Sequence, residues 1–168
     1  KEQNNKLSLE NDKYKNKTEI GFYSSETIEG NKNQYFLKSY ILPFFNDENL
    51  NLVNLLGKIK DKKELNDRSC IKVVTDKNDN AIYFSREPIP SQSKSNNKIK
   101  YYKQVCLIPF KRDFLIKYNK LKESYLEKIE SIDMLRVIEN EYKVRMVKIN
   151  KYTHAVDTPS DLRLVSNL

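Results

Sequence analysis

Apolar residues fall into short runs separated by polar segments over most of the chain, a spacing that predicts strands alternating with helices. Residues 71–74 and 81–84 are rich in β-branched and aromatic side chains, and the polar segment 76–80 lies between them. This order is typical of a β-hairpin. The same pattern predicts two further strands, at 101–110 and at 144–149.

A second periodicity, with an apolar side chain at every third position, predicts an amphipathic helix from about Ser124 to Asn140. Its apolar positions are Leu126, Ile129, Ile132, Leu135 and Ile138. Glu127 follows Ser124 by three residues, which is the sequence signature of a capping box. We expect two shorter helices at 111–120 and 159–165. Strands alternating with helices indicate an α/β fold, with a mixed sheet and flanking helices.

The N-terminal part of the chain is less regular. Residues 1–18 are polar without periodicity and predict a tail or linker, which leaves 19–168 as one domain. We expect a short strand at 20–23. A proline and an Asn-Asp pair interrupt the apolar positions of 35–56, so two short elements are favoured there. The run at 51–59 is compatible with a strand or a helix.

The composition excludes several classes of protein. The chain has 168 residues, enough for one domain, and its 38% apolar content excludes wholesale disorder. It contains no apolar run long enough to span a bilayer and no signal-peptide pattern, so we expect a cytoplasmic protein without membrane contact. With 2 Cys and 1 His, neither a disulfide framework nor a zinc site is expected.

The net charge of +8 is concentrated in one segment. Residues 91–122 carry nine basic side chains against one acid, Asp113, which leaves the rest of the chain neutral. Such a segment can attract an anion, or it can be a solvated face. A nucleic-acid partner is disfavoured because the signature of an RNA-binding domain is absent.

No phosphate-binding lysine loop, Gly-rich dinucleotide turn or nucleophile elbow is present. Arg86 follows a strand, where its guanidinium can hold a carboxylate by two hydrogen bonds or can be a surface charge. Gln104 can bind a sugar hydroxyl or serve as a structural amide, and Glu130 is a pocket acid or a helix-surface charge. Asp157 precedes a helix, where a carboxylate suits Mg²⁺ or the helix dipole.

Four stretches in order carry a family resemblance: IKVVTDKNDNAIYFSREPIP, YKQVCLIPFKRDFL, YLEKIESIDMLRVIENEYKVRMV and VDTPSDLRLV. Together they resemble the C-terminal two-thirds of the 3-deoxy-manno-octulosonate cytidylyltransferases, also called CMP-Kdo synthetases. The resemblance runs from about residue 66 to 165. It implies a Rossmann-like nucleotidyltransferase fold, of which this chain has a part, and a homodimer.

The resemblance also implies an activity, in which CTP and an acidic eight- or nine-carbon sugar give the CMP-sugar for a lipopolysaccharide and pyrophosphate, with Mg²⁺ as cofactor. Arg86, Gln104 and Glu130 correspond to positions near the sugar, and Asp157 corresponds to the metal-binding aspartate. Gln104 stands where the family usually has histidine, and Ile108 where many members have tyrosine. The nucleotide-binding residues stay unassigned.

The first 65 residues do not match the family's N-terminal third, which carries a loop rich in Arg, Ser and Lys for the CTP phosphates. The chain is therefore part of a longer enzyme or has lost catalysis. Two other classes stay open: a non-catalytic sugar-binding or partner protein, and a nucleic-acid-binding domain that uses the basic segment 91–122.

Overall fold

The computed structural model describes residues 20–24, 47–94 and 99–149, with the backbone alone for 20–24. The predicted tail at 1–18 and the predicted helix at 159–165 lie outside these ranges. Of the helices within them, none has the length and apolar character to cross a membrane.

A five-stranded mixed sheet forms the centre of the described domain, in the order β4-β3-β5-β2-β7. Its strands are β2 (Val53–Lys58), β3 (Lys72–Thr75), β4 (Ala81–Ser85), β5 (Tyr102–Val105) and β7 (Arg145–Lys148). Strand β2 runs parallel to β7 and antiparallel to β5, while β3 and β4 form an antiparallel hairpin. The hairpin and the β7 strand are confirmed, and the run at 51–59 is a strand.

The turn of the hairpin is built by local polar contacts. The Asp76 carboxylate accepts hydrogen bonds from the side chain of Asn80 and from the backbone N–H groups of Asn78 and Asn80, and these bonds lower the pKa of Asp76. Asp79 adopts the left-handed conformation, with φ of 58°. Asn80 also forms a bridge with Arg145, so the turn contacts the start of β7.

A second, two-stranded sheet pairs β1 (Ile20–Ser24) antiparallel with β6 (Leu107–Lys111). The strand predicted at 20–23 is confirmed. The single strand predicted at 101–110 is wrong, because the chain bends at Cys106 and its two halves join different sheets. β5 pairs with β2, and β6 continues beside β1.

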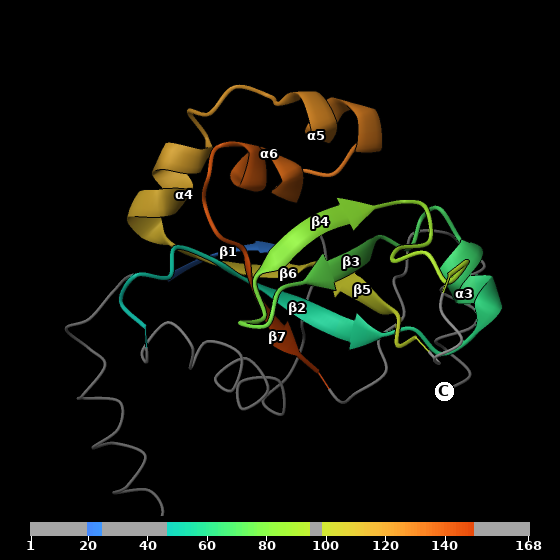
Figure 1. The fold of residues 1–168 in the computed structure, drawn as a ribbon. Helices are drawn as coiled ribbons and strands as arrows, with labels where there is room; N and C mark the ends of the chain where they lie inside the picture. Colours follow the sequence, from blue (N-terminus) through green and yellow to red (C-terminus); the bar gives the residue numbers. More distant parts are fainter. Residues whose placement is uncertain (1–19, 25–46, 95–98, 150–168) are drawn as a thin grey trace, which may run out of the picture.

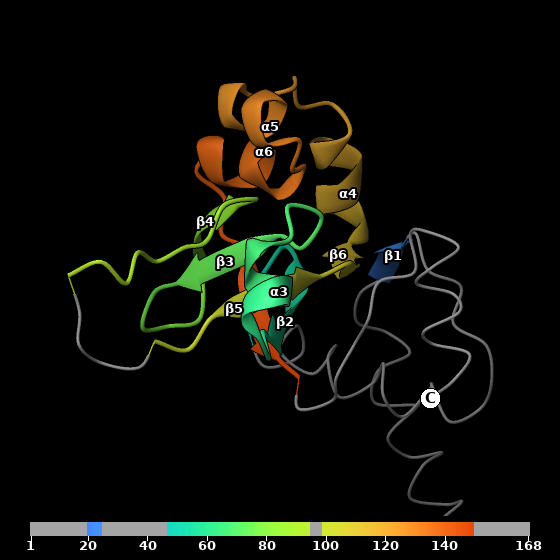
Figure 2. The ribbon, with the colours of Figure 1, turned by 90° about the vertical axis from the view of Figure 1, so that its right-hand side faces the viewer.

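Three helices, α4 (Arg112–Tyr118), α5 (Tyr125–Glu130) and α6 (Met134–Glu139), lie together above the sheet in both views (Figures 1 and 2). The single helix predicted from Ser124 to Asn140 is wrong. Ser131, with φ of 53°, ends α5 in the left-handed conformation and lets α6 start in a new direction. The predicted capping box at the start of α5 is confirmed.

The short helix α3 (Lys62–Asn66) lies at one end of the sheet and was not predicted (Figure 1). It buries none of its residues, so it carries no apolar stripe. A polar signal was nevertheless present, because Asp61 accepts the N–H of Glu64 (2.8 Å) and Glu64 accepts the N–H of Lys60 (3.0 Å).

The main hydrophobic core lies between the five-stranded sheet and the three upper helices. It joins strand residues to helix residues and comprises Leu52, Leu56, Val73, Phe84, Ile108, Phe110, Phe114, Ile132, Met134, Leu135, Val137, Val144 and Met146. The ring of Phe114 meets that of Tyr142 edge-on, with centroids 4.9 Å apart. This core holds α5 and α6 in place beside β4.

Candidate active-site edge

The last residues of β2 and β4 lie in one row across the sheet, with the first residues of β5 and β3 between them, and α3 lies beside this row (Figure 1). The strand register shows this directly: Gly57 pairs with Lys103, Lys103 with Lys72, and Lys72 with Ser85. In open α/β sheets, ligands bind outside the carboxyl ends of parallel strands, and the parallel strands β2 and β7 both end on this side. This side of the sheet is therefore the candidate active-site edge of the chain.

Arg86 follows β4 at this edge, and its guanidinium contacts three backbone carbonyl groups. Nε donates to Glu130 O (2.6 Å), Nη2 to Ser131 O (2.9 Å) and Nη1 to Arg68 O (2.9 Å). Two of these carbonyls belong to the end of α5 and one to the loop after α3. Arg86 thus joins three segments, and two of its five N–H donors remain for other partners.

The Glu130 carboxylate lies against the end of β4. It accepts hydrogen bonds from the Ser85 hydroxyl (2.9 Å), the Arg86 N–H (2.9 Å) and the Tyr83 hydroxyl (3.3 Å). Burial together with the Glu130 charge raises the pKa of Tyr83, so its hydroxyl stays a donor at neutral pH. The structure therefore brings Arg86 and Glu130 together as one cluster; their predicted contacts with a sugar stay predictions.

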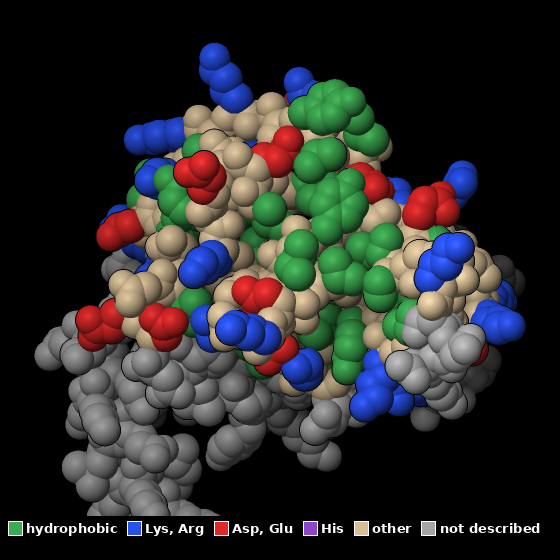
Figure 3. Space-filling view, viewed as in Figure 1, with side chains coloured by type: hydrophobic (Ala, Val, Ile, Leu, Met, Phe, Trp, Pro, Cys, Tyr) green, Lys and Arg blue, Asp and Glu red, His purple; other side chains and the backbone are tan. Residues whose placement is uncertain are grey.

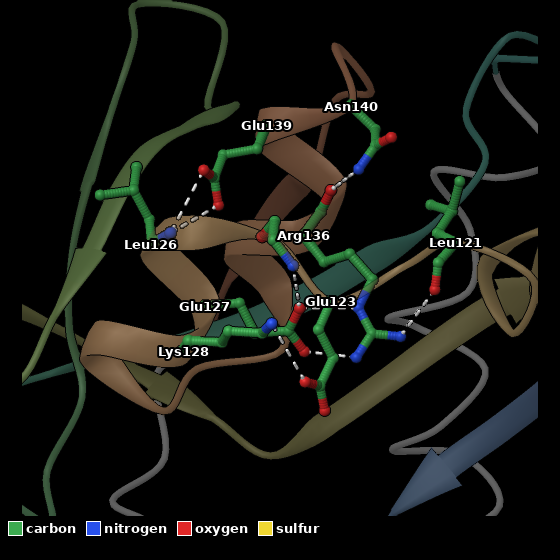
Figure 4. A network of polar contacts seen from close by, with 9 residues as sticks. Leu121, Glu123, Leu126, Glu127, Lys128, Arg136, Glu139 and Asn140 are labelled. Carbon is green, nitrogen blue, oxygen red and sulfur yellow. Dashed lines mark hydrogen bonds and ion pairs between the residues drawn. The ribbon is translucent and has the colours of Figure 1, made fainter.

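Helix α5, which ends at Glu130, is fixed to α6 by a carboxylate–guanidinium pair (Figure 4). Arg136 Nε donates to Glu127 Oε2 (2.7 Å), and Nη2 donates to Glu127 Oε1. Burial alone would raise the pKa of Glu127, but the hydrogen bonds from Arg136 and the Ser124 N–H outweigh it and lower that pKa. The hydrogen bonds that Arg136 donates to Glu127 raise the pKa of Arg136. This pair positions the helix end that carries Glu130.

Gln104 lies on β5, opposite Leu56 of β2. Its N–H donates to Ile71 O (2.9 Å), while its side-chain Oε1 is buried without a hydrogen-bond partner. Within the described ranges, no hydrogen bond joins Gln104 to Arg86 or Glu130. The structure therefore leaves its predicted sugar contact as a prediction.

Asp157, the predicted Mg²⁺ ligand, lies outside the described residues. Within 20–24, 47–94 and 99–149, no three His, Cys, Asp or Glu side chains are grouped so that they could hold a metal ion. The metal role of Asp157 therefore stays a prediction.

Two buried lysines at the active-site edge were not predicted from the sequence. Lys72 is fully buried, and its Nζ donates to Asp67 O (2.8 Å) and Cys70 O (2.6 Å); burial lowers its pKa. Lys103 pairs with Glu64 of α3 at 2.5 Å. Their charges hold α3 and the following loop on the sheet. Both lysines lie within apolar runs of the sequence. Such a position indicates a buried lysine, which needs a polar partner.

Comparison with known proteins identifies relatives of the chain. The family model described as "Cytidylyltransferase" matches residues 9–149, a range that begins ahead of the four stretches quoted above. A 3-deoxy-manno-octulosonate cytidylyltransferase of Fusobacterium nucleatum is 40% identical over 78% of this chain and 53% of its own length. The enzyme of the same name from Solibacter usitatus is 39% identical over 76% of this chain and 51% of its own length.

Solved structures agree with this result. A CMP:2-keto-3-deoxy-manno-octonic acid synthetase complexed with CTP superposes with a TM-score of 0.77 and 27% identity, over 95% of this chain and 65% of that one. An inositol-1-phosphate CTP transferase from T. maritima, 16% identical with a TM-score of 0.52 over 94% of this chain and 57% of its own, shares the fold.

These neighbours confirm the predicted Rossmann-like nucleotidyltransferase fold, with its mixed sheet and flanking helices. The chain spans about half the length of the curated relatives it matches. A family model that covers most of the chain, relatives at up to 40% identity and a superposable fold lead to one conclusion: the chain belongs to the cytidylyltransferase family.

Proposed function

We propose that this chain supplies the acidic-sugar part of a cytoplasmic cytidylyltransferase, which makes a CMP-activated sugar of eight or nine carbons for a lipopolysaccharide. The similarity to 3-deoxy-manno-octulosonate cytidylyltransferases, at 40% identity over 131 residues, is the observation that carries the proposal. In this reaction the anomeric hydroxyl of the sugar attacks the α-phosphorus of CTP. A P–O bond forms, the bond to pyrophosphate breaks, and the hydroxyl proton is released.

The described residues support a positioning role toward the sugar. Arg86 retains two N–H donors after its three carbonyl bonds, and a planar pair of donors matches the sugar carboxylate. Glu130 holds Arg86 in place through the Arg86 N–H and Nε–H. The Gln104 side chain has a buried oxygen with unused acceptor capacity for a sugar hydroxyl.

Calorimetric titration of the 168-residue chain with 3-deoxy-manno-octulosonate tests the proposal, with neutral mannose as the control ligand. We expect saturable binding of the acidic sugar alone. Replacement of a bidentate guanidinium by lysine removes a charge-assisted bond worth about 1.5–3 kcal/mol. Arg86→Lys should therefore weaken the sugar about 10- to 150-fold.

Arg86 also joins three backbone segments, so its replacement can lower stability as well. Gln104→Ala, which leaves the Arg86 contacts intact, separates the two effects and should weaken the sugar with little change in the melting temperature. Absence of acidic-sugar binding by the unaltered chain contradicts the proposal.

We assign Mg²⁺ to the same proposal, with Asp157 as a carboxylate ligand of the kind this hard cation prefers. Asp157→Asn keeps the shape and removes the charge. In the enzyme that contains this chain, it should lower the rate of pyrophosphate release by orders of magnitude and change stability by about 1 kcal/mol or less. A nearly unchanged rate contradicts the metal role, whatever the thermal melt shows.

We also propose a homodimer, supported by an apolar surface on the described domain. Figure 3 shows apolar side chains forming a band from α5 across the neighbouring strands. Among the described residues, α5 and β4 carry three exposed large apolar side chains: Tyr125 (72%), Ile129 (63%) and Ile82 (56%). An exposed patch of this kind is typical of a protein–protein contact.

A further inference from the structure

Residues 67–70, which follow α3, form a tight loop beside the end of β4. The Asp67 carboxylate accepts hydrogen bonds from the backbone N–H of Ser69 (2.8 Å) and from its hydroxyl (2.7 Å). The Cys70 N–H donates to Asp67 O (3.2 Å), which closes the loop. Three carbonyl groups of the loop then accept hydrogen bonds from cationic side chains of the hairpin β3–β4.

Lys72 binds the two outer carbonyl groups of this loop from inside the protein. Its side chain is fully buried, and its Nζ donates to Asp67 O (2.8 Å) and to Cys70 O (2.6 Å). A buried ammonium group is costly without hydrogen-bond acceptors, so Lys72 keeps these two carbonyl groups in place. Lys72 thus fixes both ends of the loop.

The third carbonyl group belongs to Arg68, between the two that Lys72 binds, and it accepts the bond from Arg86 Nη1 (2.9 Å). Lys72 pairs with Ser85 in the β3–β4 ladder, so the two cations come from neighbouring positions of one hairpin. Any shift of the loop moves the acceptor of Arg86 Nη1. The orientation of the Arg86 guanidinium therefore depends on the bonds that Lys72 makes.

A surface ion pair also joins the loop to the residue after Arg86. Arg68 Nη2 lies 2.9 Å from Glu87 Oε1, but the two side chains are 79% and 63% exposed. Exposed ion pairs contribute little to stability, because water and salt screen them. The buried bonds of Lys72 are therefore the stronger attachment of the loop to the hairpin.

We propose that Lys72 is a positioning residue of the sugar site: through the loop 67–70 it orients the Arg86 guanidinium and so determines the preference for a carboxylate. This inference rests on the proposed function of Arg86. The three carbonyl bonds of Arg86 leave one N–H donor on Nη1 and one on Nη2. Such a pair holds a carboxylate by two parallel bonds only when the guanidinium plane is fixed. Lys72 itself stays buried and acts through the loop.

Calorimetric titration of the 168-residue chain with 3-deoxy-manno-octulosonate and with its methyl ester, which lacks the carboxylate charge, measures this preference. Lys72→Met keeps an unbranched side chain and removes the donors to the loop. We expect it to lower the ratio of acid affinity to ester affinity at least about threefold, because a loosened guanidinium loses part of a charge-assisted bond. An unchanged ratio, or an equal loss for both ligands, overturns the proposal.

Two further variants separate positioning from stability. Asp67→Ala removes the side-chain bonds that shape the exposed loop, leaves Lys72 in place and should lower the same ratio. Val73→Ala, at a core position of β3, lowers the melting temperature through a cavity but removes no donor to the loop, so the ratio should not change. An unchanged ratio in Asp67→Ala, or a loss in Val73→Ala equal to that in Lys72→Met, overturns the proposal.

A measurement without sugar distinguishes failure of this inference from failure of the proposed function. The NMR signal of the Arg86 Nε–H, assigned by its loss in Arg86→Lys, reports the hydrogen bond to Glu130 O. We expect faster hydrogen exchange of this group in Lys72→Met than in the unaltered chain. Faster exchange supports the positioning role even if the unaltered chain binds no sugar, a result that contradicts the proposed function alone. An equal exchange rate overturns the positioning role.

Discussion

Asn54 is a polar residue within an apolar run, and it is fully buried. It lies fully buried on β2, between the core residues Leu52 and Leu56, and both polar atoms of its side chain lack a hydrogen-bond partner in the described structure. A buried amide without partners costs about 1–3 kcal/mol. The apolar run around it was compatible with a strand or a helix, and only the packed strand shows that the amide is buried and unpaired.

Asn54→Val tests this cost. Valine replaces the amide by a β-branched apolar side chain that suits a buried strand, so we expect the free energy of unfolding to rise by about 1 kcal/mol. Urea denaturation of the two proteins measures the difference. A loss of 1 kcal/mol or more would show that a bound water or ligand satisfies the amide.

At the scale of elements, Glu127 takes part both in the capping box of its own helix, α5, and in an ion pair with α6. The capping box of α5 is encoded within four residues, from Ser124 to Glu127. Glu127 also pairs with Arg136, which lies on α6 beyond the left-handed Ser131. The helical break therefore brings together two side chains that a continuous helix would keep on different turns.

Glu127→Gln should expose the pH dependence of this attachment. The pKa of Glu127 lies below its usual value of 4.5 in the folded chain, so the unfolded chain binds the proton more readily. Its stabilising effect is complete above the usual value and is lost as pH falls through the lowered pKa. We expect a loss of about 1.5–3 kcal/mol at neutral pH that shrinks on acidification.

Denaturant unfolding at pH 7 and at pH 3 measures this difference between the two proteins. Glu123→Gln is the control, because Glu123 is 64% exposed and its contact with Lys128 is long (3.8 Å). A Glu127→Gln deficit that stays constant with pH would contradict the assigned role of the carboxylate.

At the scale of the whole molecule, the apolar band over α5 and β4 predicts that two chains associate. Ile129→Asp places a charge at an exposed apolar position of α5. We expect light scattering after size exclusion to shift from the mass of two chains to that of one, 19.9 kDa. Ile116→Asp, at a 45% exposed position on α4, is the matched control and should leave the dimer intact.

A monomeric unaltered chain at high micromolar concentration would contradict the dimer. Equal dissociation by both substitutions would place the contact elsewhere on the surface.

The sequence by itself determined the features that depend on near neighbours. The hairpin follows from two β-branched runs around the Asp76–Asn80 turn, whose hydrogen bonds join residues at most four apart. The capping box and β7 follow in the same way. The quoted stretches also indicated the family correctly, because family motifs are kept as contiguous residues.

Tertiary structure decided the features that join distant residues. Arg86, at the end of β4, donates a hydrogen bond to Glu130, which is 44 positions away in the sequence. Lys103 bonds to Glu64, which is 39 positions away. The helix expected to continue to Asn140 stops at Ser131, because packing of Met134, Leu135 and Val137 into the core favours a new direction over the continuous stripe. Spacing along the chain cannot encode such contacts, since they form only when the sheet and helices pack and exclude water.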